Sequence, residues 1–422
     1  MIVPAYNPFR PRMRVTHISI IHKPLDVRIF EKECRALAGA GYEVHLIVGA
    51  PPATEVDGVL LHSVANDSTR PLARRQWARL LRAARWAFRL RPSIYHLHDP
   101  HLIPLGLLLK LSGARVVYDV HEDYPAHARS KLVAHPLLGL LKAFMWIVLE
   151  SLAQRGLDGF VCASPALAEK FPATSTVVVR NFPRHREFAL PEVEPGSRPY
   201  RKRRNTLVYT GNIREIRGFW EMVRALELLP ADLDCRLRMI GWFTPPELAR
   251  SARRLEAWSR MEFIPWQRHR VLVRELLSAK IGLILLHPLP NHGDPIRSNK
   301  LFEFMAAGIP VIAPELPRWR EIVCGIGCGL VVDPRDPAAI AAAIEDLLRR
   351  PEEAEAMGRR GQAAVRTEFN WDAEAPRLLS LYRRFEDGQA RFRTAPPPES
   401  LTSLAAAERR TALLAERRTP SA

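Results

Sequence analysis

Short, continuous runs of apolar residues alternate with helix-like stretches along the first half of the chain. Residues 15–21 and 42–48 are predicted to be two buried strands. Between them, Phe30, Leu37 and Ala38 recur on one face of a helix that the following glycines end. Further strands are predicted at residues 94–97, 115–120 and 159–163, with a helix over residues 105–111. The alternation predicts an α/β domain whose parallel sheet is covered by helices on both faces.

The pattern stops at residues 191–204, where prolines and a basic run replace the periodic apolar positions. We interpret this stretch as an interdomain linker, and its basic run, residues 201–204, either is solvated or grips phosphates. A second alternating series then predicts strands at residues 206–211, 235–241, 261–264, 281–286 and 310–313. The chain therefore predicts two consecutive Rossmann-like domains, whose ligands bind at the carboxyl ends of the strands.

This pattern gives a complete domain plan for the chain. It consists of an N-terminal tail at 1–13, a Rossmann-like domain at 14–190, the linker at 191–204 and a second Rossmann-like domain at 205–370. A helix at 371–386 is expected to pack back on the N-terminal domain. Residues 387–422, rich in Pro, Ala, Arg and Glu, are expected to form a disordered basic tail.

The strongest candidate for a membrane segment is the apolar run at residues 137–149. Lys142 interrupts it, and it falls short of the roughly 20 residues that span a bilayer. We expect it to form a buried helix. The alternative is an apolar helix face that rests on a membrane beside Lys131, Lys142 and Arg155.

The composition narrows the classes of partner. The chain has 422 residues, 47% of them hydrophobic, and 62 Lys and Arg against 45 Asp and Glu give a net charge of +17. Such a charge suits a nucleic acid, an anionic membrane surface or a phosphorylated substrate. We expect no nucleic acid, because no zinc finger, recognition helix or aromatic-basic RNA motif is evident. Five scattered cysteines and a start unlike a signal peptide indicate a reduced, cytoplasmic protein.

The common cofactor motifs are missing from the sequence. It contains no Walker loop, no H-E-x-x-H helix, no C-x-x-C pair and no G-x-G-x-x-G after the first strand. Cys324 and Cys328 lack further ligands at zinc-site spacing. We therefore expect neither a metal nor a redox cofactor.

The richest polar segment is at residues 294–300, just before a helix that is predicted to begin near Leu301. The first N–H groups of a helix and the charge of Lys300 would together hold a diphosphate without a metal. Glu303, expected in the first turn, would accept hydrogen bonds from sugar hydroxyls. The alternative is that Glu303 only complements the helix dipole and that Lys300 is solvated.

Residues 299–313 (NKLFEFMAAGIPVIA) resemble the donor-site signature of retaining glycosyltransferase family 4, which has the GT-B fold. The segments DVRIF (26–30), HLHDP (96–100), YDVHEDYP (118–125) and YTGN (209–212) resemble a bacterial surface-polysaccharide branch of that family. The resemblance covers residues 14–386. It implies two Rossmann-like domains facing each other across a cleft, and sugar transfer from a nucleotide sugar to a glycan or polyprenyl-linked acceptor. Such relatives work at the inner face of the cytoplasmic membrane, so a peripheral attachment to its anionic surface is implied.

The resemblance also assigns roles to residues. Glu303 matches a glutamate that contacts the ribose, Lys300 and Arg217 match positions beside the phosphates, and His121 matches a histidine close to the transferred sugar. The catalytic residues implied are His121, Arg217 and Lys300. The donor-binding residues implied are Gly211, Asn212, Arg217, Asp294, Ser298, Asn299, Lys300, Leu301 and Glu303. The residues expected to line the acceptor side or the cleft are Asp26, Arg28, His98, Asp99, Glu122 and Asp123.

Two positions depart from the family pattern. The first motif glutamate should stand eight residues before Glu303, where this chain has Pro295, and Asn212 stands where many relatives have arginine. Asp294, next to Pro295, is a candidate substitute for the missing carboxylate. These departures leave open a catalytically idle binding subunit of a glycan-synthesis complex. A nucleotide-sugar epimerase of the same two-domain shape is a further alternative.

Overall fold

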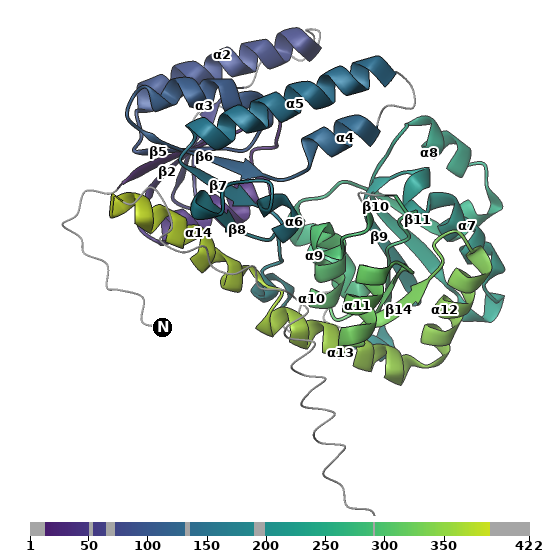
Figure 1. The fold of residues 1–422 in the computed structure, drawn as a ribbon. Helices are drawn as coiled ribbons and strands as arrows, with labels where there is room; N and C mark the ends of the chain where they lie inside the picture. Colours follow the sequence, from purple (N-terminus) through teal and green to yellow (C-terminus); the bar gives the residue numbers. More distant parts are fainter. Residues whose placement is uncertain are drawn as a thin grey trace, which may run out of the picture.

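The computed structural model describes residues 13–49, 54–64, 72–130, 136–189, 199–289 and 292–388. Within these ranges, two sheets form the centres of two α/β domains (Figure 1). The predicted fold class, α/β with two Rossmann-like domains, is confirmed. The expectations for residues 1–12, 191–198 and 389–422, and for Lys131, lie outside the described residues.

The first sheet has eight strands in the order β3-β4-β2-β1-β5-β6-β7-β8, and only the β3–β4 pair is antiparallel. The strands are β1 (Arg14–Ile18), β2 (Glu43–Val48), β3 (Thr54–Val56), β4 (Val59–Ser63), β5 (Ile94–Leu97), β6 (Arg115–Val120), β7 (Gly159–Cys162) and β8 (Thr176–Val178). Strand β1 ends three residues before the end of its apolar run. The reason is that the N–H groups of Ile20 and Ile21 donate to the buried Asp99 carboxylate instead of to a neighbouring strand.

Helices cover both faces of the first sheet. One face carries a short π-helix, η1 (Ile29–Cys34), and α1 (Arg35–Gly39). The other face carries the larger layer, α2 (Leu72–Leu90), α3 (Ile103–Lys110) and α5 (Pro136–Gly156), over buried Tyr95, Tyr118 and Phe160. The helices α4 (Tyr124–Ser130) and α6 (Pro165–Ala168) follow β6 and β7.

The second domain repeats this plan with six parallel strands in the order β11-β10-β9-β12-β13-β14. Its strands are β9 (Thr206–Ile213), β10 (Arg236–Phe243), β11 (Met261–Pro265), β12 (Ile281–Leu283), β13 (Val311–Pro314) and β14 (Gly329–Val332). Its helices are α7 (Phe219–Leu228), α8 (Glu247–Ala252), α9 (His269–Ser278), α10 (Asn299–Ala306), α11 (Pro317–Ile326), α12 (Pro337–Arg349) and α13 (Pro351–Thr367). One apolar core joins them to the sheet.

The last helix, α14 (Trp371–Glu386), leaves the second domain and runs along the first (Figure 1). Its Leu378, Leu381 and Tyr382 are buried in the core on the η1 side of the first sheet. The Glu374 carboxylate is fully buried and pairs with Arg180 at 2.7 Å, after β8. The first domain is therefore completed by residues from the far end of the chain.

The basic run at residues 201–204 packs on the second domain. Arg201 forms exposed ion pairs with Glu352 and Glu355, and Arg203 donates to the Ala279 carbonyl oxygen at 3.0 Å. Arg201, Lys202 and Arg204 are exposed, as expected for a solvated run, and only Arg203 is half-buried.

The expectation of a buried helix at residues 137–149 is wrong. These residues form most of α5, but Leu137, Leu141 and Phe144 are 81%, 65% and 64% exposed. The helix packs on α3 and α4 along one narrow side, and no other described element covers its apolar outer face. None of the described helices is long and apolar enough to cross a membrane.

Candidate donor site and the buried network beside it

The loop after β9 carries the first half of the candidate donor site. Gly211, near the end of β9, has φ +98°. After the strand, a 3₁₀ turn, Glu215–Arg217, leads to Gly218. Gly218 has φ +77°, and a Cβ atom there would lie 2.5 Å from both the Cβ and the carbonyl oxygen of Leu285. Glycine is therefore required at this position, and it sets the place of Arg217.

Substitution of Gly218 by alanine tests this geometry. Gly113 is a matched control, because it has φ +82° and a Cβ atom added there would meet nothing within 4 Å. We expect G113A to cost about 1–2 kcal/mol of unfolding free energy, the cost of left-handed backbone for a residue with a Cβ. G218A should cost more, because it adds the clash with Leu285. Urea unfolding of both variants checks this, and equal losses would contradict it.

Two cations at this loop, Lys300 and Arg217, each have a buried nitrogen atom without a hydrogen-bond partner among the described residues. The Lys300 Nζ atom is buried, 3.9 Å from the centre of the Tyr209 ring, and it has no hydrogen-bond partner among the described residues. The buried Nε atom of Arg217 also lacks a partner within that part of the chain. Burial, and the nearby charge of Arg217, lower the pKa of Lys300 well below its ordinary value. This pair of cations is a candidate site for an anion such as a diphosphate.

Helix α10 begins at Asn299, two residues earlier than predicted. Ser298 is its N-cap residue but makes no side-chain cap. Leu301 is fully buried, and its N–H already donates to the Ser298 carbonyl oxygen, so its role is in the core. The free N–H groups of a helix are the earliest ones, which here belong to Asn299 and Lys300. At the candidate anion site, Lys300 therefore offers both its backbone N–H group and its side-chain ammonium group.

Because α10 begins early, Glu303 lies in its second turn and not in its first. A simple complement to the helix dipole is therefore excluded. Burial raises the pKa of Glu303 above its ordinary value, although the charges of His269, Lys32 and Lys300 oppose this. The carboxylate thus faces cations from both domains, since Lys32 belongs to η1 and His269 to α9. Neither residue was predicted from the sequence.

Of the two family departures, Pro295 is buried and Asn212 is half-buried, as is Asp294 next to Pro295. The Asp294 carboxylate accepts from the Ile296 N–H at 3.1 Å and lies 3.7 Å from Arg318, so it caps the short turn at Pro295. Asn212 has a buried side-chain oxygen without a partner among the described residues. It lies beside Trp242, its neighbour in the β9–β10 register. Asp294 is engaged structurally, whereas Asn212 has an acceptor available for a ligand.

In the first domain, His121 follows β6 and is partly exposed. Its Nε2 atom lies 2.8 Å from the Asp119 carboxylate, which is fully buried and binds Arg28 through two hydrogen bonds, at 3.0 and 2.8 Å. Burial alone would raise the pKa of Asp119, but Arg28 and His121 hold it well below its ordinary value. A charged Asp119 thus orients the imidazole of His121.

Three residues expected at the acceptor side are buried instead. Arg28 is 4% exposed and binds Asp119, Glu33 and the Val179 carbonyl oxygen. His98 is fully buried between His17 and Asp119, at 2.8 and 3.2 Å. Asp99 accepts the N–H groups of Ile20 and Ile21 and holds the loop after β1. These residues have structural roles, because their polar atoms already bind other residues of the protein.

The other three acceptor-side candidates lie nearer the surface. Asp26 accepts from the N–H groups of Arg28 and Ile29 and caps η1. Asp123 caps α4 through the Ala126 N–H and pairs with Lys170. Glu122 is exposed. Of this set, only Glu122 has no structural partner assigned within the described residues.

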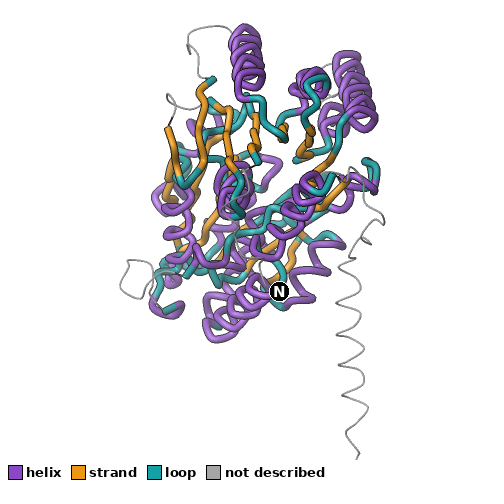
Figure 2. Tube along the Cα trace, turned by 90° about the vertical axis from the view of Figure 1, so that its left-hand side faces the viewer, coloured by secondary structure: helices purple, strands orange, loops and turns teal. Residues whose placement is uncertain are grey.

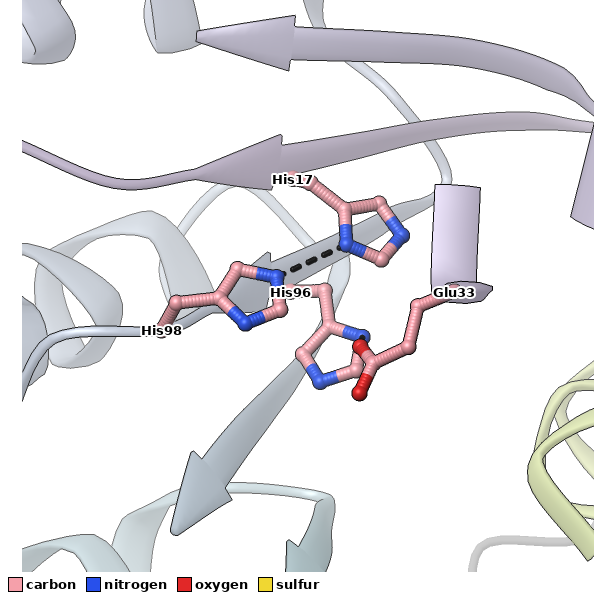
Figure 3. A group of neighbouring side chains, drawn as sticks. All are labelled: His17, Glu33, His96 and His98. Atoms are coloured by element: carbon pink, nitrogen blue, oxygen red, sulfur yellow. Dashed lines mark hydrogen bonds and ion pairs between the residues drawn. The ribbon is translucent and has the colours of Figure 1, made fainter. Parts of the chain in front are cut away.

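His17, Glu33, His96 and His98 form a fully buried cluster (Figure 3). It lies next to His121, whose Nε2 atom is 3.4 Å from His98 Nδ1. These residue types bind zinc in other proteins. Here, however, the Arg28 guanidinium already lies 3.1 Å from Glu33, so a metal ion would face a buried positive charge. Burial, with the Asp119 charge, raises the pKa of Glu33 well above its ordinary value, which favours a neutral carboxyl group. We therefore interpret the cluster as a buried polar network and not as a metal centre.

The sequence contained a signal for this network. His96 lies in β5 and His98 directly follows that strand, so an extended backbone puts the two side chains on the same face. The register of β1 and β5 then places His17 directly beside His96. The Tyr382 hydroxyl of α14 lies 2.7 Å from His96 Nδ1 and extends the network to the end of the chain.

Loops from the two domains meet above the candidate site. Lys23, after β1, lies 5.5 Å from the centre of the Trp266 ring, after β11. Glu187 pairs with His269 at 2.9 Å. Both contacts involve residues that follow strands, so the carboxyl ends of the two sheets face one another.

Two facing Rossmann-like domains with an anion site at the start of α10 define the class of GT-B glycosyltransferases. Residues 28–182 match the family model described as Glycosyltransferase Family 4, and residues 204–350 match the model described as Glycosyl transferases group 1. The chain belongs to glycosyltransferase family 4.

Known proteins agree with this class. Glycogen synthase of Mycobacterium tuberculosis is 24% identical over 314 residues, which cover 71% of this chain and 70% of that protein. The structure of HepE from Anabaena with UDP-glucose has a TM-score of 0.62 and 13% identity, over 88% of this chain and 100% of that chain. WaaG, a glycosyltransferase of lipopolysaccharide biosynthesis, has a TM-score of 0.63 and 13% identity, over 87% and 99%. The two structures share the fold with this protein.

Proposed function

We propose that this glycosyltransferase moves a hexose, with retention of configuration, from a nucleotide sugar to a glycan or polyprenyl-linked acceptor in cell-surface polysaccharide synthesis. The observation that carries the donor half of the proposal is that the buried Nζ atom of Lys300 and the buried Nε atom of Arg217 have no hydrogen-bond partner among the described residues. A nucleoside diphosphate supplies that anion. The structures of HepE with UDP-glucose and of WaaG support a nucleotide sugar and a surface glycan.

The roles proposed for the site residues are those that the family resemblance implies, and the placement of the residues supports them. Lys300, Arg217 and the first N–H groups of α10 stabilise the charge that develops on the departing diphosphate. Glu303 binds the ribose, and His121, oriented by Asp119, contacts the transferred sugar. The acceptor hydroxyl approaches from the first domain and gives its proton to the leaving phosphate oxygen. In this proposal two fixed cations replace a metal, so transfer should persist in EDTA.

Screening of UDP-, GDP- and ADP-sugars for thermal stabilisation tests the donor half. A ligand that binds the native state raises its apparent stability, and at 100 times Kd the gain is about 2.7 kcal/mol. We expect one nucleotide series to raise the melting temperature of the wild type and to fail with R217A. R214A, an exposed arginine three residues earlier, is the control and should respond like the wild type. Absence of any nucleotide effect on the wild type would overturn the proposal.

A catalytically idle binding subunit remains the second candidate, and the observation in its favour is Pro295, with Asp294 engaged as a cap. Such a subunit would bind the nucleotide but neither hydrolyse nor transfer the sugar. Radiolabelled donor with a lipid-linked acceptor separates the two, because only the enzyme yields a longer glycan. An epimerase would instead release a new nucleotide sugar without any acceptor.

A further inference from the structure

The outer helical layer of the first domain gathers most of the exposed apolar side chains. Among the described residues, thirteen of twenty exposed large apolar side chains lie on α2, on α3 with the following Leu111, and on α5. They are Trp77, Leu81, Phe88, Leu108, Leu111, Leu137, Leu140, Leu141, Phe144, Met145, Ile147, Val148 and Leu152. Contiguous exposed apolar surface of this kind marks an interaction site.

The same layer is strongly basic. Helix α2 contains six arginines, and α5 contains Lys142 and Arg155, whereas Lys110 of α3 is paired with Asp158 at 2.7 Å. Acidic residues are almost absent from these helices. Helices α2 and α3 contain none, and the one acidic residue of α5, Glu150, is buried. An apolar surface flanked by cations complements an anionic lipid surface, where acyl chains lie beneath negative headgroups.

The position of this helical layer next to the candidate site favours a lipid surface as its partner. In a parallel sheet, a helix that follows a strand begins at the carboxyl end of that strand, so the start of α5 lies at the edge that carries His121. Trp146 of α5 confirms this placement, because its ring packs on His101 and Tyr124, which follow β5 and β6. The three helices cover one face of the first sheet, as Figure 1 shows, and the tube in Figure 2 shows their layer at one end of the molecule.

We propose that α5, with the arginines of α2 in the same helical layer, docks this protein on an anionic lipid bilayer and so presents the candidate site to membrane-borne acceptors. The apolar residues of α5 enter the headgroup region, and the arginines contact lipid phosphates. The purpose of this docking rests on the proposed lipid-linked acceptor, but the docking itself does not require a donor or an acceptor.

Vesicle flotation of the full chain tests the docking. The probes are vesicles of phosphatidylglycerol with phosphatidylcholine, and vesicles of phosphatidylcholine alone. We expect the wild type to float with the first kind and to remain largely unbound with the second. Raised salt should weaken binding only in part, because charge is screened but apolar insertion is not. A wild type that fails to float at low salt would overturn the proposal.

Single glutamate substitutions locate the surface. L141E and F144E place a charge in the exposed face of α5, and each should weaken vesicle binding about ten-fold or more, since a large apolar side chain no longer inserts. L228E is the matched control, because Leu228 on α7 is similarly exposed, 58% against 65% for Leu141. It should bind vesicles like the wild type. Equal flotation of L141E and the wild type would overturn the assignment.

Two further measurements distinguish membrane docking from dimer formation and from a failure of the proposed function. Light scattering after size exclusion reports the oligomeric state, and a dimer that L141E dissociates while flotation stays unchanged would make α5 an interface between two copies instead. Nucleotide-induced thermal stabilisation of L141E in vesicle-free solution should equal that of the wild type. Normal flotation without any nucleotide effect would contradict the proposed function alone, and the reverse result would contradict the docking alone.

Discussion

Replacement of Lys300 by methionine is expected to lower kcat/KM for the nucleotide sugar by about 100- to 1,000-fold, the usual effect of removing one group that stabilises the departing charge. The ligand-free variant should nevertheless melt at a higher temperature than the wild type. Methionine keeps the apolar contact with the Tyr209 ring, and it removes a buried ammonium group that lies near Arg217 without a hydrogen-bond partner in the described chain. Scanning calorimetry and donor turnover measure the two effects on the same sample.

The pKa of Lys300 adds a third readout. Because burial and Arg217 lower that pKa, part of the ligand-free protein has a neutral Lys300 as the pH rises. Binding of a diphosphate favours the charged form, so it should draw a proton from solution, and affinity should fall with rising pH. Calorimetric titration with UDP or GDP in buffers of different ionisation enthalpy detects the proton. K300M should bind without this uptake.

Lys280 supplies the control for K300M. It is also buried, but it binds Asn205 at 2.8 Å, away from the candidate site. K280M should retain its affinity for the donor and lose stability, the opposite of the result expected for K300M. If the K300M protein kept full transferase activity, the assignment of the donor diphosphate to this site would be contradicted.

The second large effect is expected in the buried network. R28M should lower the free energy of unfolding by about 3–5 kcal/mol, because it leaves the Asp119 carboxylate buried without its cation. Arg28 is 4% exposed and makes two hydrogen bonds to Asp119 and one to the Val179 carbonyl oxygen. Urea unfolding at neutral pH measures the loss. The variant should also transfer sugar more slowly, since Asp119 orients His121.

The matched control for R28M is R14M in the same domain. Arg14 pairs with Glu43 at 2.7 Å, but the two side chains are 41% and 33% exposed. Exposed pairs contribute about 0–1 kcal/mol, so R14M should be nearly neutral. A similar loss in R28M and R14M would show that the buried network contributes little to stability.

Much of the fold could be predicted because each strand and helix carries its own periodicity. The apolar runs at β5 and β6 coincide with the predicted strands, and α10 begins within two residues of its predicted start. The donor segment could be predicted for the same reason, since the helix start and Lys300 are adjacent in the chain. Its partner Arg217 followed from the family resemblance, and the structure places the two beside Tyr209.

The acceptor side was predicted poorly. A polar residue after a strand can point toward ligand or back into the domain, and sequence position alone does not distinguish the two. Arg28, His98 and Asp99 turn inward, because each finds complementary polar atoms on a neighbouring strand or loop.

The sequence by itself determined the α/β class, the two-domain order and the helix start at the candidate donor segment, because these depend on local periodicity and on residues close together in the chain. Only the tertiary structure decided which polar groups are buried and which apolar ones are not. The register of β1 against β5 brings His17 beside His96, and α14 returns to bury Tyr382 against them. The apolar run of α5 stays exposed because no described element lies over it, and an apolar sequence cannot show whether a cover exists.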